Sequence, residues 1–542
     1  MTTPGAYDVI VIGGGHNGLV AAAYLARDGR RTLVLERRDE LGGAAVTSEI
    51  APGYRAPTLA HTVGRLRPSV VRDLRLADRT LQFIEPDARA FLPLPDGRGV
   101  TLWADAGRTA EEVRLAWGAA EADGWHELDR LIGRLARVMG DLAAITPPDF
   151  KAIGLGDALA GLRLLRSYRS LGRADRAALL RLLPMPIADT VSEHLEAEPL
   201  RAAVALRGVL YSALGPMSAG TTATLLADAA GGGGAAGRTV YAHGGPGALA
   251  SALAGAARGF GAEIRTGAEV ARILARDGKV QGVALDSGEE IPARAVVSAA
   301  DPKRTLLGLV DPVELGPHLR WRMSNYRTTG SLAKVNLALG ELPAFSALAA
   351  VADAAARLGG RIVLTESVVA LERAFDECRA GRIPSSPPLE ATIPSLVDGT
   401  LAPEGRHVMS VIVQYVPYRL ADAEWDACRE VLGDIVLRRL EEAAPGITRL
   451  VEARQVITPL DLERDYSMTG GHPLHGEPSL DQWFAWRPLL ELGRYRTPIV
   501  GLYLAGSGSH PGGGITGGPG ANAAREILAD LQSVGGKGGR HD

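Results

Sequence analysis

Three glycines and one acidic residue near the start of the chain have the spacing of a dinucleotide site. Gly13, Gly15 and Gly18 occupy the glycine positions of a G-x-G-x-x-G turn, and Glu36 follows them. The first glycine permits a tight turn, the second lets a diphosphate approach main-chain N–H groups, and the third lets a helix pack on its strand. A carboxylate at Glu36 can accept both hydroxyls of an adenosine ribose. The pattern therefore predicts a bound dinucleotide.

The elements that must position these residues follow in the required order. Residues 7–12 are β-branched and almost continuously apolar, which is typical of a strand buried on both faces. Residues 19–27 place small apolar side chains on one helical face, and residues 32–35 form a second strand that delivers Glu36 to its end. This order predicts one half of a doubly wound nucleotide-binding sheet.

Two other stretches, residues 232–237 and 512–517, fit the same glycine spacing. The first follows a helix-forming segment, so we interpret it as a flexible loop. Only the N-terminal copy has strand, turn, helix, second strand and acid in sequence. We therefore expect His16 and Asn17, inside that turn, to contact the dinucleotide with the glycines.

A glycine doublet after the acidic residue favours FAD over NAD. Gly42 and Gly43 let the backbone approach a second part of the cofactor, the diphosphate and ribityl end of a flavin; plain turn glycines are the alternative. Residues 506–520 are dense in glycine and lead into a helix expected at residues 521–531. Such a turn offers many backbone N–H groups to a ligand, so we expect it to complete the flavin site.

Candidate cofactor contacts come from these stretches and from two flanking positions, Arg37 and Val270. The full set is Gly13, Gly15, His16, Asn17, Gly18, Glu36, Arg37, Gly42, Gly43, Val270, Gly506, Ser507, Gly514 and Ile515. His510 is the titratable group expected nearest the flavin ring, with a turn-capping role ahead of Pro511 as the alternative. His61 is either a satisfied structural residue or a neighbour of the flavin or substrate. No metal-ligand cluster, Ser-His-Asp set or carboxylate pair stands out, so no catalytic side chain is assigned.

Composition excludes several classes of protein. The net charge is −3 and the pI about 6.4, which gives no reason to expect nucleic acid as a partner. Cys378 and Cys428 are too far apart in sequence for a C-x-x-C redox pair. The first residues lack a basic start and an apolar core, so we expect a cytoplasmic protein. The uncharged run 208–227 is interpreted as a buried helix and turn that line an apolar cavity, not as a membrane span.

The predicted fold class is α/β, with a discontinuous Rossmann-like FAD-binding domain, a substrate domain and a helical cap. Strands expected between residues 263 and 298 form a β-meander that returns the chain to the first sheet. The FAD-binding domain then comprises residues 1–75, 238–304 and 495–532. Residues 76–237 are a largely helical cap, residues 305–494 are the substrate domain, and residues 533–542 are a disordered tail.

The cap contains a basic, leucine-rich segment between residues 162 and 182. Six arginines alternate there with leucines: Arg163, Arg166, Arg169, Arg173, Arg176 and Arg181. A basic amphipathic helix of this kind can rest on an anionic membrane, and it can equally be the solvated face of a cap. Peripheral membrane contact therefore remains one of two alternatives.

These stretches together resemble the phytoene dehydrogenase (carotenoid desaturase) superfamily of FAD-dependent oxidoreductases. The resemblance is carried by the N-terminal glycines with Glu36, by residues 241–302 and above all by residues 502–514. Residues 478–482 and 487–488 are most similar to the branch named pyridine nucleotide-disulfide oxidoreductase domain-containing protein 2. The resemblance covers nearly the whole chain and implies an FAD fold like that of amine oxidases. Related flavoproteins have an acidic residue where this chain has Ser507.

The resemblance implies that an apolar, isoprenoid- or lipid-like substrate transfers a hydride to flavin N5. One alternative is a flavin oxidase of amines or other small substrates on the same fold, and another is a flavin-bound interaction protein without turnover. The chain has no second strand-turn-helix-acid unit for NAD(P). We therefore expect oxygen or a quinone as the electron acceptor.

Overall fold

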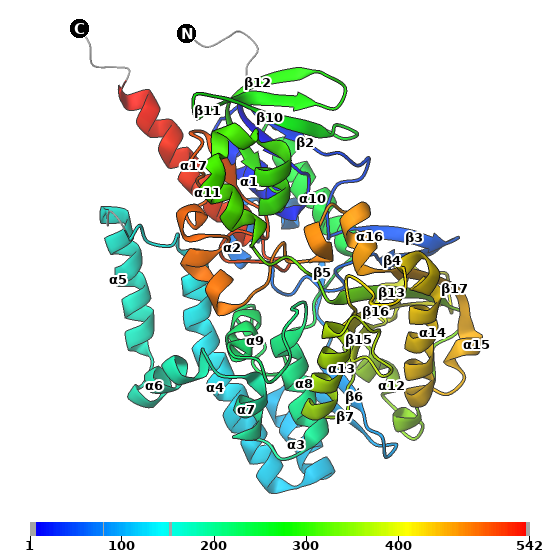
Figure 1. Cartoon of the computed structure of the whole chain (residues 1–542). Coiled ribbons are helices and arrows are strands. Elements are labelled where there is room, and N and C mark those ends of the chain that lie inside the picture. Colours follow the sequence, from blue (N-terminus) through cyan, green and yellow to red (C-terminus); the bar gives the residue numbers. More distant parts are fainter. Residues whose placement is uncertain (1–6, 80, 151–153, 538–542) are drawn as a thin grey trace.

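A computed structural model describes residues 7–79, 81–150 and 154–537, whose main layers are two seven-stranded sheets and a group of helices, the helical layer (Figure 1). The first sheet has the order β10-β11-β12-β1-β2-β9, and β18 also pairs with β12. The parallel strands are β1 (Tyr7–Ile12), β2 (Thr32–Leu35), β9 (Glu263–Arg265), β12 (Glu290–Ser298) and β18 (Leu502–Leu504). Two antiparallel strands, β10 (Val270–Arg276) and β11 (Lys279–Leu285), continue from β12 as the expected meander.

Strand β1 is buried on both faces, as its apolar sequence predicts. Val9 and Val11 pack into one core, and Ile10 and Ile12 pack into another on the opposite face. Three helices cover the first face: α1 (His16–Arg27), α10 (Pro246–Gly259) and α17 (Gly518–Lys537). Helix α11 (Pro312–Ser324) covers the second. The predicted strand, turn, helix and strand from β1 to β2 are thus confirmed.

The second sheet has the order β17-β13-β16-β15-β14-β6-β7. Its strands are β6 (Ala88–Pro93), β7 (Gly99–Trp103), β13 (Leu332–Leu339), β14 (Arg361–Leu364), β15 (Leu389–Thr392), β16 (His407–Gln414) and β17 (Val451–Ile457). Helix α14 (Trp425–Ala443) packs on its outer face. Strands β6 and β7 come from the segment expected to be largely helical. They join the sheet because Phe91 buries its ring in the core beneath α14.

A hairpin of β3 (Thr47–Ala51) and β4 (Tyr54–Pro57) ties the N-terminal segment to the second sheet. Tyr54 and Ala56 share a small core with Ala338 of β13 and Val408 of β16. The chain therefore reaches across from the first sheet to the second before the helical layer begins. This contact fixes the two sheets relative to one another on one side of the space between them.

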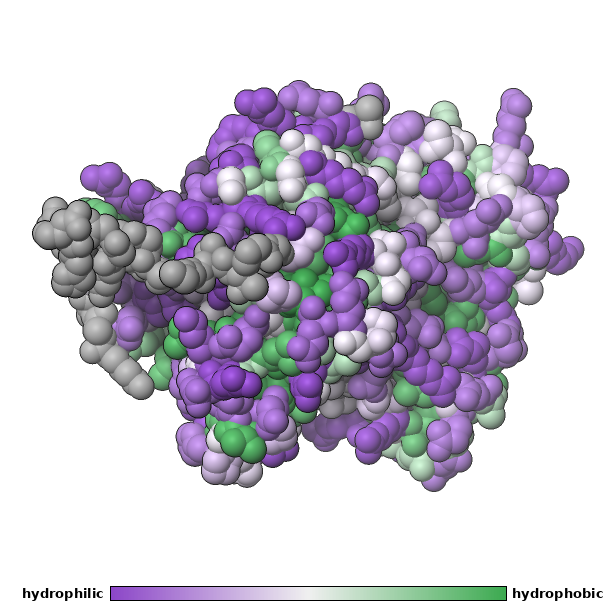
Figure 2. Space-filling view, turned by 90° about the horizontal axis from the view of Figure 1, so that it is seen from above, coloured by the Kyte–Doolittle hydropathy of each residue, from purple (hydrophilic) through white to green (hydrophobic). Residues whose placement is uncertain are grey.

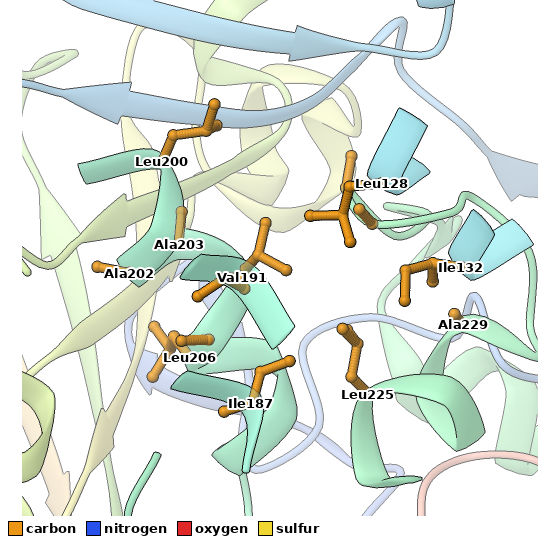
Figure 3. Packing of buried hydrophobic residues seen from close by; sticks show 14 of the residues in the cluster. Leu128, Ile132, Ile187, Val191, Leu200, Ala202, Ala203, Leu206, Leu225 and Ala229 are labelled. Atoms are coloured by element: carbon orange, nitrogen blue, oxygen red, sulfur yellow. The ribbon is translucent and has the colours of Figure 1, made fainter. Parts of the chain in front are cut away.

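The helical layer packs on the second sheet and shares one core with it, which also contains Leu92 of β6, Leu102 of β7 and Ile412 of β16; Figure 3 shows the helical part of this core. The helical layer is built from α3 (Ala106–Trp117), α4 (Ala119–Ala144), α6 (Arg173–Leu182), α7 (Ile187–Ser192), α8 (Glu198–Val209) and α9 (Thr221–Ala229). Leu128 and Ile132 of α4 face Val191, Leu206 and Leu225 there. The uncharged run 208–227 spans the end of α8, a turn and most of α9. In the described part of the chain, no helix is both long and apolar enough to cross a membrane.

Helix α5 (Leu155–Ser170) stands out from the body of the protein (Figure 1). Leu159, Leu162 and Leu165 are all exposed on it, beside Arg163 and Arg166. The face of the molecule seen from above is in contrast mostly hydrophilic, with only small separate hydrophobic patches (Figure 2). The exposed leucines of α5 are compatible with both alternatives for this basic segment.

The C-terminal helix is longer than the sequence predicts. Helix α17 continues to Lys537, so residues 533–537 of the expected disordered tail are helical. Ile527 anchors the helix in the core of the first sheet, and each residue added to a helix that is already formed contributes a further hydrogen bond. Residues 538–542 lie outside the described residues.

Candidate functional site

One large cavity lies between the two sheets. Ile12 and Leu35, at the C-terminal ends of β1 and β2, line it on one side, and Lys334 and Glu390 from the second sheet line it on the other. Ligands of open α/β sheets bind at the C-terminal ends of the parallel strands. We call the part lined by the glycine turn, Glu36 and residues 507–515 the cofactor arm.

The glycine turn leaves the start of α1 open to the cofactor arm. Gly15 is the N-cap residue of α1, and no side chain caps this end. The unpaired N–H groups and the helix dipole favour a negatively charged ligand here. A Cβ on Gly18 would lie 2.1 Å from the carbonyl oxygen of Gly13, so only glycine allows α1 to pack this close to β1.

The glycine doublet packs directly against this turn. The Gly42 N–H donates to the Gly14 carbonyl at 2.9 Å. Gly43 has a φ of +62°, and a Cβ there would lie 3.2 Å from Cα of Gly15. Glycine is required for both reasons, because larger residues strain this backbone and crowd the turn. Gly43 therefore forms part of the wall of the arm directly beside the start of α1, with Gly42 behind it.

Glu36 is nearly buried at the end of β2 and lines the arm. Its two carboxylate oxygens accept N–H groups from Gly14 at 2.7 Å and from Arg38 at 3.0 Å. These bonds hold the carboxylate beside the glycine turn. Each oxygen retains a further lone pair with which it can accept a ribose hydroxyl.

The C-terminal glycine-rich stretch closes the arm. Asn17 donates from Nδ2 to Ser507 Oγ at 3.2 Å, and His16 Nε2 lies 3.2 Å from the Gly514 carbonyl. The Oδ1 atom of Asn17 is buried and has no hydrogen-bond partner among the described residues. A buried acceptor of this kind requires a donor, which a bound ligand can supply. Burial also lowers the pKa of His16 to about 4, so its ring is neutral.

Arg487, which belongs to a motif singled out in the sequence, organises this stretch. Its guanidinium is fully buried and lines the cavity. It donates to the carbonyl oxygens of Leu474, Gly476, Glu477, Gln482 and Ser507 at 2.8–3.3 Å. The Arg487 side chain thus ties the carbonyl of Ser507, in the turn after β18, to residues 474–482. Arg487 is a positioning residue for the cofactor arm.

Most of the predicted cofactor residues meet at this cavity. Those that line it are Gly13, Gly15, His16, Asn17, Gly18, Glu36, Arg37, Gly43, Val270, Ser507, Gly514 and Ile515. Gly42 and Gly506 lie behind the wall; a Cβ on Gly506 would lie 2.5 Å from the Ala299 carbonyl oxygen. His510 does not line the cavity. Its Nε2 lies 3.1 Å from the Leu142 carbonyl and its ring meets the edge of Phe484.

The other end of the cavity, which we call the inner chamber, is lined by Arg65, Arg207, Asp228, Lys334, Arg361 and Glu390. Lys334 Nζ lies 3.2 Å from His61 Nδ1, and His61 Nε2 lies 3.2 Å from a Glu390 oxygen. Arg361 donates to the second Glu390 oxygen at 3.0 Å. Only one neutral tautomer of His61 is compatible with this series of hydrogen bonds: Nδ1 accepts from Lys334, and Nε2–H donates to Glu390.

Burial separates the protonation states of these groups. It lowers the pKa of Lys334 to about 7 and that of His61 to about 4. Burial alone raises the pKa of Glu390, but the charge of Arg361 and the hydrogen bond from His61 outweigh it and lower the value to about 2. Near neutral pH, Glu390 is therefore ionised and His61 is neutral, while Lys334 is present in both its protonated and its neutral form.

Sequence reasoning raised His61 as an open alternative and missed the charged groups that line the chamber. Lys334 is the one charged residue in the otherwise apolar or neutral strand β13, and side chains on a strand alternate between its faces. Val335 and Leu337 face the core under α14, so Lys334 must face the other way. A charge inside such a strand is the signal that could have located the chamber.

The cofactor arm fits a flavin adenine dinucleotide. The open helix start, the glycine walls, the Glu36 carboxylate and the unpartnered Asn17 oxygen supply what a ribose and a diphosphate require. Beyond them the cavity continues past Ser507 and Ile515 toward the second sheet, which leaves room for the flavin half of the molecule. These residues would hold FAD.

Comparisons with known proteins agree with this geometry. Residues 18–528 match the family described as flavin containing amine oxidoreductase. The chain is 36% identical to pyridine nucleotide-disulfide oxidoreductase domain-containing protein 2 of Rattus norvegicus, over 97% of this chain and 94% of that protein. It is 26% identical to phytoene desaturase (neurosporene-forming) of Rhodobacter capsulatus, over 98% of this chain and 94% of that protein. Cyclohexylamine oxidase from Brevibacterium oxydans has a similar structure, with a TM-score of 0.58 and 14% identity, over 97% of this chain and 100% of that chain.

Proposed function

The chain belongs to the family of flavin-containing amine oxidoreductases, and we propose that it is a dehydrogenase or desaturase that oxidises a C–H bond in a largely apolar molecule. An FAD-dependent oxidoreductase is the coarse function that the family supports. The observation that carries the finer proposal is the wall of the inner chamber. Its uncharged side chains are mostly apolar and include Leu210, Ala223, Leu332 and Trp483.

Bound FAD supplies a hydride acceptor at the flavin, and the chain supplies binding, orientation and exclusion of water. The cofactor arm holds the dinucleotide through the start of α1 and Glu36. The apolar walls of the inner chamber bury the substrate. Lys334 can hold or release a proton near neutral pH, because burial lowers its pKa to about 7. His61 and Glu390 fix the position of the Lys334 ammonium.

Oxidation of an amine is the second candidate, because structural neighbours such as cyclohexylamine oxidase act on amines by name. One observation weighs against it in this chain. The inner chamber holds more cationic than acidic side chains, which repels an ammonium substrate.

The test is anaerobic reduction of the flavin-loaded protein by a panel of isoprenoids, long-chain acids and primary amines, followed at the visible flavin band. The proposal expects bleaching by apolar members and recovery of the band when oxygen or a quinone is added. Bleaching by amines alone would favour the second candidate. Photoreduced flavin that neither oxygen nor quinones reoxidise would instead indicate a flavin-bound protein without turnover.

A further inference from the structure

The inner chamber contains an excess of buried positive charge. Arg207 pairs with Asp228, and Arg65 lies 3.5 Å from the same carboxylate. Arg361 pairs with Glu390. Lys334 adds a fourth cation, and the two carboxylates already have partners. The chamber therefore carries a formal excess of two positive charges when Lys334 is protonated.

Lys334 is the least satisfied of these cations. Its side chain is 1% exposed, and among the described residues its ammonium has one hydrogen-bond partner, Nδ1 of His61. An ammonium has three N–H donors, and Nδ1 takes only one of them. The nearest carboxylate, Glu390, uses one oxygen for His61 and the other for Arg361. Because the Lys334 side chain lines the cavity, its other two N–H donors are available to a ligand there.

Two further polar atoms of the chamber lack partners within the described chain. Nε of Arg207 and Oγ1 of Thr224 are both buried without a hydrogen bond. Both residues line the cavity. Buried polar atoms are almost always paired, so donors left free around one cavity indicate that a ligand with acceptor oxygens completes them. The surrounding walls are apolar, which strengthens the attraction of these donors for an anion.

We propose that the inner chamber binds an acidic group, a carboxylate or a phosphate, at one end of the substrate, and that Lys334 is its principal partner. The substrate is then an amphipathic acid, not a neutral hydrocarbon and not an amine. This inference rests on the proposed function, because it assigns the substrate class of the same site. FAD does not balance this positive charge. Its diphosphate would lie at the start of α1, next to the first sheet, and the ring of oxidised flavin that reaches the chamber is uncharged.

The test compares ten-carbon probes with different end groups. Decanoate, decyl phosphate, decan-1-ol and decylamine are titrated at pH 6.5 into the flavin-loaded protein by calorimetry, and the visible flavin spectrum is recorded in parallel. A charge-assisted hydrogen bond predicts that one or both anions bind about 10- to 100-fold more tightly than decan-1-ol. The tighter of the two anions identifies the acidic group, and decylamine should bind most weakly.

Variants assign the preference to the chamber. Lys334→Met should lower anion affinity by about 10-fold or more and leave decan-1-ol unchanged, whereas Lys334→Arg should keep most of the preference. Lys279→Met, at an exposed position at the start of β11, is the matched control and should change neither. If Lys334→Met does not fold, Arg65→Gln removes a partly exposed charge from the same chamber and should also reduce the preference.

Equal binding of decanoate, decyl phosphate and decan-1-ol would overturn the inference. It would also be overturned if the Lys334→Met and Arg65→Gln variants, once folded, kept the full anion preference and altered only the flavin midpoint potential. Failure of the proposed function is a separate result. A chain that takes up no flavin contradicts the oxidoreductase assignment, while calorimetry of the flavin-free protein and its Lys334→Met variant still reports whether the chamber prefers an anion.

Discussion

Replacement of Gly18 by alanine tests the cofactor arm with a single methyl group. The new Cβ would lie 2.1 Å from the Gly13 carbonyl oxygen and 3.1 Å from the Ala299 Cβ. Gly13 belongs to the turn, so the backbone of α1 must move by about 1 Å to restore a normal contact. Overpacking of this kind costs about 1–3 kcal/mol. If most of this energetic cost is relieved by displacing the N–H groups at the start of α1, FAD affinity falls by about 10- to 100-fold.

The matched control is Gly255→Ala in α10. A Cβ on Gly255 meets no atom within 4 Å, and the helix should gain up to about 1 kcal/mol. The assay is fluorescence titration of the flavin-free protein with FAD, with circular dichroism to confirm folding. Retention of wild-type FAD affinity by a folded Gly18→Ala variant would refute the assignment of this turn to the diphosphate.

Three further predictions concern other parts of the chain. Arg487→Met leaves buried carbonyl oxygens without a donor, so we expect the denaturation midpoint to fall by the equivalent of at least about 3 kcal/mol; an unchanged midpoint would contradict its positioning role. Burial lowers the pKa of His61 to about 4 and that of His510 to about 3, from an ordinary value of 6.5 in the unfolded chain. As the pH falls below 6.5, the unfolded chain is therefore protonated at these histidines before the folded chain is. The free energy of unfolding then falls by about 1.4 kcal/mol per pH unit for each histidine. A melting temperature that stays constant from pH 7 to pH 5 would argue against this. For α5, a membrane contact predicts co-sedimentation with phosphatidylglycerol vesicles at low salt that is lost in a Leu159→Ser/Leu162→Ser variant, whereas a solvated cap predicts no sedimentation in either case.

The cofactor arm could be predicted from the sequence because its signals are local. Gly13, Gly15 and Gly18 are read from one turn, and the strand that ends at Glu36 follows within the same unit. The glycine density of residues 506–520 predicted that they complete the same site, and the structure brings Ser507 and Gly514 to this turn. Stretches that carry strong local patterns are the ones in which element type is most reliable.

The inner chamber could not be predicted in the same way, because its residues meet only through the pairing of distant strands. Lys334, Arg361 and Glu390 come from β13, β14 and β15, and the register of the second sheet puts them on one face. His510 shows the converse. Its position in a glycine-rich turn left a flavin contact and a turn-capping role open, and in the structure the carbonyl of Leu142 at the end of α4 lies within hydrogen-bond reach of its ring. Neither arrangement has a signature within a short window of sequence.

A crystal structure of the chain saturated with FAD tests the central claim most directly. The account predicts one FAD per chain, with its adenosine at Glu36, its diphosphate at the start of α1 and its flavin end reaching the inner chamber that contains Lys334. FAD bound elsewhere, or a chain that takes up none, would contradict it.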